Sequence, residues 1–200
     1  LWDTETTDFS IRSTPYGKDL VRQYVDAFRK QGIRVGFYFS PEDFCYLRSR
    51  GLTITRTPLE PYSKEVMNGY RALLTAQMTE LMQNYGKIDV MFFDGGETMY
   101  NEEGESLQQL CMQVAWDLQP GILITRGAIP TPEQQLPGIG VDFAWEGCIT
   151  LGTAWQYQPT NEQYKTGLHV IRLLTETRAK GGSLLLNVGP DANGELCREQ

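Results

Sequence analysis

Short apolar runs alternate with amphipathic segments along the chain, and this alternation constrains the fold more than any other feature. The apolar runs are rich in β-branched and aromatic residues, which favour strands, and they cover residues 33–40, 88–93, 122–125, 141–145 and 183–188. Because the runs are nearly continuous in hydrophobicity, they predict a parallel sheet with helices outside it. We therefore predict an α/β fold, either doubly wound or closed as a (β/α) TIM-type barrel.

Apolar residues also recur at helical spacing between these runs. The pattern predicts helices over residues 17–31, about 70–84, about 107–119 and about 161–180. Gly32 and Pro120 are typical residues to follow the end of a helix, and each is followed by a predicted strand. Residues 41–64 and 127–140 show neither pattern, so we expect long loops there.

The length of the chain sets the expected number of domains. With 200 residues, 40% of them hydrophobic, the chain can build one substantial core and has little room for two domains. We therefore expect a single domain over residues 1–200. A complete barrel needs about 250 residues, so the predicted strands indicate a partial barrel that lacks two or three strands at its N-terminus.

Composition excludes several classes of function. The formal net charge is -7 and no basic run contains interleaved aromatic residues, so we expect no nucleic acid partner. No stretch approaches the roughly 20 apolar residues that cross a bilayer, so we expect no membrane segment. Four well-separated cysteines and a single histidine, His169, predict no metal site. We place His169, on the last predicted helix, on the outside of the barrel.

Polar side chains stand at the carboxyl ends of the predicted strands. They are Tyr38, Asp94, Arg126, Glu146 and Asn187. The active site of a (β/α) barrel is built at the carboxyl ends of its strands, so these five side chains would meet in one cleft.

Two of these residues are carboxylic acids in settings that suit chemistry. Asp94 lies where a buried strand meets Gly95-Gly96, although Asp-Gly is also a common turn dipeptide. Glu146 follows Trp145, whose indole would partly shield the carboxyl from water as a general acid requires; the alternative is a surface glutamate. As a pair they match retaining glycoside hydrolysis, for which the two carboxyls lie about 5–5.5 Å apart.

Several segments resemble motifs of the α-L-fucosidases of glycoside hydrolase family 29, and together they span nearly the whole chain. The strand tyrosine of the family is matched by GIRVGFYFSPEDF, and the strand that carries its nucleophilic aspartate is matched by QNYGKIDVMFFDGG. The family's Trp-Glu-x-Cys-x-Thr resembles WEGCIT, and its Trp-Gly-Tyr resembles AWQY. The most specific match is AKGGSLLLNVGPDANG, which is similar to the family's Lys-Gly-Gly segment.

The resemblance implies a catalytic barrel domain that releases terminal α-L-fucose from fucosylated glycans. It implies an exo-acting, retaining mechanism through a covalent glycosyl-enzyme, with no cofactor. By position it assigns the nucleophile to Asp94 and the acid/base to Glu146. Glu42 and Asp43, which follow the Tyr38 strand, are alternative acids for the second role. A secreted, periplasmic or lysosomal location is also implied by the family.

The resemblance further indicates residues that bind the sugar. Arg126 matches a family arginine that reaches the sugar, although a salt bridge at the barrel rim is the alternative. Tyr38 matches a family tyrosine that contacts fucose, with ordinary barrel packing as the alternative. Phe92 would form an apolar wall, and Trp145 and Trp155 lie where stacking on a sugar is expected.

Departures from the family pattern leave two other functions open. Phe92 stands where the family often has tryptophan, and Glu97 stands where some members have an aromatic residue. The paired histidines of the family would precede residue 1. One alternative is therefore a related retaining glycosidase that acts on another 6-deoxy or galacto-configured sugar. The other is a non-catalytic carbohydrate-binding relative.

Overall fold

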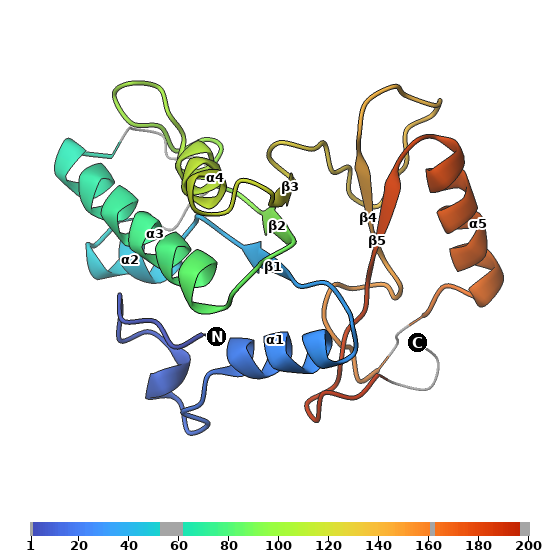
Figure 1. The fold of residues 1–200 in the computed structure, drawn as a ribbon, viewed down its shortest axis with the longest axis horizontal. Helices are drawn as coiled ribbons and strands as arrows, with labels where there is room; N and C mark the ends of the chain where they lie inside the picture. The colour runs from blue at the N-terminus through green and yellow to red at the C-terminus, as the bar shows by residue number, and fades with distance from the viewer. Residues whose placement is uncertain (1, 53–61, 161–162, 197–200) are drawn as a thin grey trace. The chain divides into compact units, whose positions relative to one another are not determined.

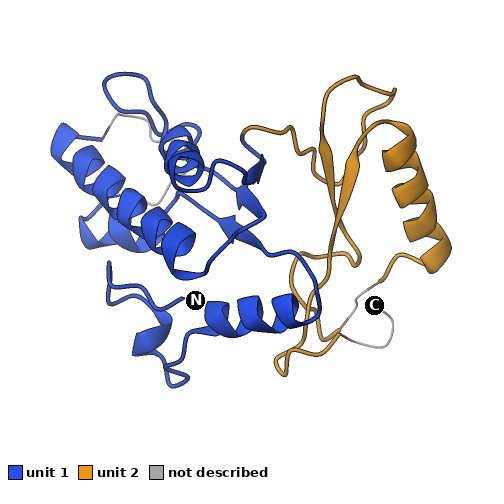
Figure 2. Cartoon of the chain, viewed as in Figure 1, with its two compact units in different colours: residues 1–127 blue, residues 128–200 orange. Residues whose placement is uncertain are grey.

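The computed structural model describes residues 2–52, 62–160 and 163–196. The chain forms two compact units, unit 1 (Leu1–Gly127) and unit 2 (Ala128–Gln200), which Figure 2 colours separately. Each unit contains its own parallel sheet. A single domain over residues 1–200 stays a prediction. Within the described ranges, no helix combines the length and the apolar character needed to span a bilayer.

Unit 1 alternates helices with three parallel strands, as Figure 1 shows. Neighbours in the chain are neighbours in the sheet, because the strand order is β1-β2-β3. This unit has the predicted parallel α/β architecture. Its elements are η1 (Ile11–Ser13), α1 (Leu20–Lys30), β1 (Gly36–Phe39), α2 (Phe44–Ser49), α3 (Lys64–Asn84), β2 (Val90–Phe93), α4 (Leu107–Leu118) and β3 (Leu123–Thr125).

The register of this sheet separates a face buried in the core from a second face that carries Tyr38 and Phe92. Tyr38 of β1 pairs with Phe92 of β2, which pairs with Thr125 of β3, and alternate residues of a strand point to opposite faces. Tyr38 is 63% exposed. The other face is buried in the core, and its members are Phe37, Phe39, Met91, Phe93 and Ile124.

Helices α3 and α4 pack against each other and supply the rest of this core. Leu74 and Met78 of α3 are fully buried, as are Cys111 and Ala115 of α4. Each pair is separated by four residues, so its members lie on one face of their helix. The predicted helices over residues 17–31, 70–84 and 107–119 are confirmed, with α3 starting earlier than predicted, at Lys64.

A short helix, α2, interrupts the loop predicted over residues 41–64. Its N-cap is Asp43, whose side chain accepts a hydrogen bond of 2.9 Å from the Tyr46 N–H. The Tyr46 ring stacks on Tyr70 of α3 at a centroid distance of 4.5 Å. With 6 residues, α2 is too short for its apolar periodicity to be recognised in the sequence.

Unit 2 contains β4 (Glu146–Thr150), α5 (Gly167–Ala179) and β5 (Ser183–Asn187). The two strands are parallel, with Glu146 opposite Ser183 and Thr150 opposite Asn187. Residues 130–134 run alongside β4 as a third parallel segment. There the Cys148 N–H donates to the carbonyl oxygen of Pro132 at 3.0 Å, and the Cys148 carbonyl accepts from the N–H of residue 134 at 2.9 Å.

The predicted strand over residues 141–145 is wrong, because the strand begins at Glu146. The chain before it is held by the turn after α5 instead. The Trp145 indole N–H donates to the Lys180 carbonyl oxygen at 3.0 Å, and the Val141 N–H reaches the same oxygen at 3.5 Å. The Trp145 ring also covers Gly182, where a Cβ atom would lie 2.3 Å from it. Trp145 is therefore buried by local packing.

Helix α5 begins at Gly167, later than the predicted residue 161, and residues 161–162 lie outside the described part of the chain. The Thr166 side chain caps it by accepting a hydrogen bond from the His169 N–H at 3.3 Å. The apolar face of this helix is exposed. The exposed fractions of its side chains are 60% for Leu168, 62% for Ile171 and 48% for Leu174.

Replacing Leu74 by alanine tests the core of unit 1. Leu74 is fully buried, so Leu74→Ala should lower the free energy of unfolding by about 2–5 kcal/mol, measured by chemical denaturation. The matched control is Leu20→Ala in α1, whose side chain is 41% exposed and which should cost less than about 1 kcal/mol. Equal losses for the two variants would contradict the assigned core.

Candidate active site

Asp94 follows β2 directly and lies at the carboxyl edge of the unit 1 sheet. Its backbone N–H donates to the Phe39 carbonyl oxygen at 3.1 Å, which continues the pairing of β1 and β2 by one residue. Gly95 and Gly96 then turn the chain with φ angles of 92° and 80°, which favour glycine. The strand and the turn therefore fix the backbone position from which the Asp94 carboxylate projects.

Both oxygens of the Asp94 carboxylate contact side chains near the carboxyl ends of the neighbouring strands, one by a hydrogen bond and one by an ion pair. The Tyr38 hydroxyl donates to Oδ2 at 2.6 Å, and the Arg126 Nε lies 3.1 Å from Oδ1. The side chains of Asp94 and Arg126 are 18% and 27% exposed, so the ion pair is partly shielded from water. A hydrogen bond to an ionised group is of the stronger kind, and together with the ion pair it holds the carboxylate in one orientation.

Arg126 reaches Asp94 from an uncommon backbone conformation. Its φ angle is 46°, in the left-handed region, which costs a residue other than glycine roughly 1–2 kcal/mol. The guanidinium carbon lies 5.7 Å from the centre of the Phe92 ring, which in turn stacks on Tyr38 at 5.5 Å. The structure thus brings together four predicted site residues: Tyr38, Phe92, Asp94 and Arg126.

The predicted alternative acids, Glu42 and Asp43, both stabilise the local backbone. Glu42 is 7% exposed, and its Oε1 accepts from the Gly96 N–H at 3.2 Å. A Cβ atom on Gly95 would lie 2.5 Å from the same oxygen. Glu42 therefore packs under the turn that follows Asp94, while the Asp43 carboxylate caps α2.

Glu146 does not lie where a strand ends. It is the first residue of β4, whose carboxyl end at Thr150 is about 13 Å farther along the strand. The prediction that Glu146 stands at a carboxyl end is therefore wrong, and the cause is the misplaced strand over residues 141–145. The glutamate is partly buried and its backbone N–H donates to the Pro130 carbonyl oxygen at 3.0 Å.

The sequence interpretation missed Glu133, which lies nearer the carboxyl ends of unit 2. Glu133 forms a parallel bridge with Cys148, two residues before the end of β4. A signal for it exists in the sequence, because the Pro-Thr-Pro run at residues 130–132 is typical of an edge segment and Glu133 follows directly.

A pocket of about 640 Å³ lies beyond the carboxyl end of β4 in unit 2. Thr150 and Trp155 line it, and Trp155 is 43% exposed, as its predicted role in stacking requires. His169 of α5 is exposed and lines the same pocket, and its assignment to the outside of the barrel stays a prediction. Trp145, in contrast, is 2% exposed, and this favours packing over contact with sugar.

The described residues contain no group of three or more His, Cys, Asp or Glu side chains that could hold a metal ion. The polar groups brought together in unit 1 are one carboxylate, one phenol and one guanidinium. Such a set can orient a nucleophilic carboxylate beside an apolar ring. In α/β enzymes with parallel strands, such as (β/α) barrels, the active site is built at the carboxyl ends of the strands. The fold and the position of this group define the chain as part of an enzyme of this class.

Comparison with known proteins identifies the family. The model of the α-L-fucosidase family matches residues 1–200, and the chain belongs to this family. It is 29% identical to α-L-fucosidase 1 of Arabidopsis thaliana, over 100% of this chain and 43% of the relative. It is 25% identical to a putative α-L-fucosidase of Caenorhabditis elegans, over 98% of this chain and 42% of the relative.

Two solved structures are similar over almost the whole chain. Isoenzyme 1 of the α-L-fucosidase of Paenibacillus thiaminolyticus has 34% identity and a TM-score of 0.77, covering 98% of this chain and 53% of that one. A Bacteroides thetaiotaomicron family 29 α-L-fucosidase has 23% identity and a TM-score of 0.80, covering 99% and 51%. That structure is a covalent intermediate, trapped with 2-fluoro-fucosyl fluoride in a glutamate-to-glutamine mutant. The chain spans about half the length of these proteins.

Replacing Gly95 by alanine tests the packing of Glu42 beneath the turn. Both Gly95 and Gly104 have positive φ angles, but only Gly95 has a neighbour within 4 Å of an added Cβ atom. Gly104→Ala should therefore cost about 1–2 kcal/mol, from its conformation alone. Gly95→Ala should cost a further 1–3 kcal/mol or so, from overpacking against Glu42, measured as free energy of unfolding. Equal costs would contradict the packing.

Proposed function

We propose that the protein releases terminal α-L-fucose from fucosylated glycans by an exo-acting, retaining mechanism, with Asp94 as its nucleophile. The observation that carries the proposal is the Asp94 carboxylate, which is held at both oxygens by Tyr38 and Arg126. Membership of the α-L-fucosidase family supports the substrate, and the covalent intermediate trapped in the Bacteroides relative supports the mechanism.

The proposed architecture is a catalytic (β/α) barrel that residues 1–200 build in part. Tyr38 of β1 and Leu123 of β3, on the face of the unit 1 sheet opposite the core, are 63% and 49% exposed, which is unusual for a parallel sheet. The apolar face of α5 is also exposed. These surfaces are consistent with further strands and helices of a complete barrel that would cover them.

In the first step an Asp94 oxygen attacks C1 of the fucosyl group, and the bond from C1 to the leaving oxygen breaks. A protonated carboxyl donates its proton to that oxygen. In the second step the carboxyl that gave up its proton, now a carboxylate, takes a proton from water. The water oxygen attacks C1 and releases Asp94. Two displacements at C1 restore its configuration, so the product is α-L-fucose.

Tyr38, Phe92 and Arg126 would set the geometry of the attack. The hydroxyl and the guanidinium hold the carboxylate, so that the nucleophile loses little freedom when the substrate binds. The Phe92 ring lies beside both donors and offers an apolar surface to the sugar. In unit 2, Trp155 is proposed as a stacking residue for the glycan, whereas a contact through Trp145 is disfavoured by its burial.

Glu146 and Glu133 are the two candidates for the acid/base. Glu146 is supported by the family motif WEGCIT and by its partial burial, which suits a general acid. Glu133 is supported by its place near the carboxyl end of β4, the edge at which barrel enzymes build their sites. The glutamate replaced in the trapped Bacteroides enzyme supports a glutamate in this role.

Replacing Asp94 by alanine tests the nucleophile. Asp94→Ala in the full-length protein should lower kcat on an aryl α-L-fucoside by roughly 10⁴-fold or more, because no covalent intermediate can form. Added azide should restore turnover and yield β-L-fucosyl azide, since a single displacement inverts C1. Arg48→Ala, which removes an exposed arginine of α2, is a surface control. Undiminished turnover by Asp94→Ala would contradict the assignment.

The acid/base is tested with Glu146→Gln and Glu133→Gln. The variant that lacks the acid/base should still form the glycosyl-enzyme from an aryl fucoside with a good leaving group, but should hydrolyse it slowly. Azide should then accelerate turnover and yield α-L-fucosyl azide, because two displacements retain the configuration. The other variant should show neither effect. If neither variant responds to azide, both assignments are wrong.

A further inference from the structure

Gln108 of α4 contacts the chain beside both members of the Asp94–Arg126 ion pair. Asp94 is followed by Gly95, and Arg126 is followed by Gly127. The Gln108 side-chain amide donates to the Gly95 carbonyl oxygen at 3.4 Å, and the same side chain lies against Gly127. One partly buried side chain therefore touches the residue that follows each charged group.

We propose that Gln108 is a positioning residue for the nucleophile, because it supports both backbone segments from which the ion pair extends. This inference rests on the proposed function and deepens it, since it names a residue that acts on the attack through Asp94 and Arg126. A glutamine suits this position because its amide can donate to a carbonyl oxygen and carries no charge that would compete with the arginine for Asp94.

The start of α4 holds the turn after Asp94 through two hydrogen bonds. Besides the side-chain amide, the Gln108 backbone N–H donates to the Gly96 carbonyl oxygen at 3.3 Å. The first N–H groups of a helix have no partner within that helix, so this donor is available to the turn. A third hydrogen bond comes from the Gly96 N–H, which donates to Glu42 at 3.2 Å. The turn is therefore bonded to α4 and to Glu42 at the same time.

Close packing leaves this turn little room to shift. A Cβ atom on Gly96 would lie 2.7 Å from the Pro41 Cβ and 3.2 Å from the Gln108 backbone nitrogen. Glycine permits such a close approach because it has no side chain. A change in the position of Gln108 should therefore move the turn, and with it the backbone of Asp94.

The contact with Gly127 connects the same part of α4 to Arg126. A Cβ atom on Gly127 would lie 2.8 Å from the Met112 sulfur and 3.5 Å from the Gln108 Oε1. Gln108 and Met112 are separated by four residues, so they lie on one face of α4. The Gly127 backbone packs directly on this face. It follows an arginine whose φ angle of 46° persists only with support from its surroundings.

The alignment of the carboxylate depends on these contacts. The Asp94 Oδ1 lies 3.1 Å from the Arg126 Nε, and Gln108 contacts the backbone beside both groups. A misplacement of about 1 Å can lower a rate by roughly 10²-fold. Phe92, which offers its ring to the sugar, is held by its own strand. Loss of the Gln108 amide should therefore slow the covalent step and leave the binding of the sugar nearly unchanged.

Labelling by 2-fluoro-fucosyl fluoride separates these two effects. In the full-length protein, the labelling rate rises with reagent concentration to a limit, which gives a first-order rate constant for the covalent step and a half-saturating concentration for binding. Gln108→Met keeps the length of the side chain and removes its amide. Its rate constant should fall about 5- to 50-fold, and its half-saturating concentration should stay within about twofold of the wild type.

Gln108→Asn, whose amide is one methylene shorter, should show the same fall, so the test does not depend on a single variant. Gln113→Met makes the matched change at an exposed glutamine of α4 and should behave like the wild type. An unchanged rate constant in the folded Gln108 variants, or a change confined to the half-saturating concentration, would overturn the positioning role alone. Failure of the wild type to be labelled at Asp94 would instead reject the proposed function itself.

Discussion

The pair of contacts from Tyr38 and Arg126 to the Asp94 carboxylate is the interaction on which the account of function depends. Tyr38 lies in β1 and Arg126 directly follows β3, so the geometry exists only when β1, β2 and β3 lie in parallel register. The core beneath the sheet fixes that register, because a shift by one residue would turn Phe39 and Phe93 away from the helices. The packing of the core therefore also determines the geometry of the site.

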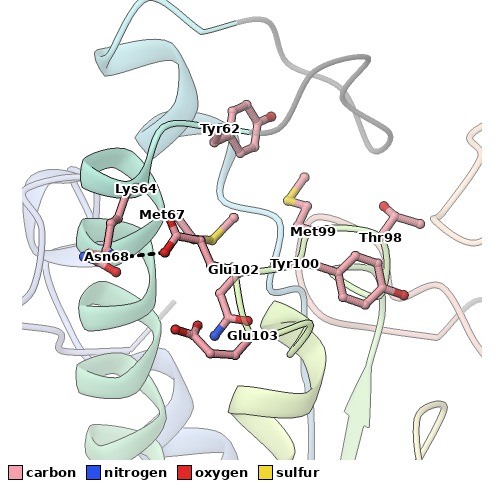
Figure 3. Close-up of a pocket in the computed structure, with 10 residues that line it drawn as sticks. Tyr62, Lys64, Met67, Asn68, Thr98, Met99, Tyr100, Glu102 and Glu103 are labelled. Atoms are coloured by element: carbon pink, nitrogen blue, oxygen red, sulfur yellow. Dashed lines mark hydrogen bonds and ion pairs between the residues drawn. The ribbon is translucent and has the colours of Figure 1, made fainter.

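The turn after Asp94 adds a second layer of support. Buried Glu42 holds Gly96 and fills the space beside Gly95, so the loop that leaves the nucleophile starts in a defined direction. That loop also lines a pocket of about 510 Å³ within unit 1, together with the start of α3 (Figure 3). Glu42, which the sequence offered as an alternative acid, thus supports the turn that follows the nucleophile.

Much of unit 1 follows from the sequence, and less of unit 2 does. Long periodic patterns identified α3 and α4, and strand ends placed Tyr38, Asp94 and Arg126 together. The pattern failed at residues 141–145, because Trp145 is buried against the turn after α5 and not in a strand. An apolar run buried in a strand and one buried against a turn look the same in a sequence. This error placed Glu146 at the wrong end of its strand. The left-handed φ angle of Arg126 has no signal in the sequence.

The central claim, that Asp94 forms a covalent bond to the sugar, is tested most directly by trapping. The full-length protein is incubated with 2-fluoro-fucosyl fluoride, in which fluorine at C2 slows both displacements while fluoride leaves readily, and is then digested and analysed by mass spectrometry. The account predicts one 2-fluoro-fucosyl group on the peptide that contains Asp94, at that carboxylate. A label on any other residue would contradict it, as would release of fluoride with inverted product and no labelled peptide.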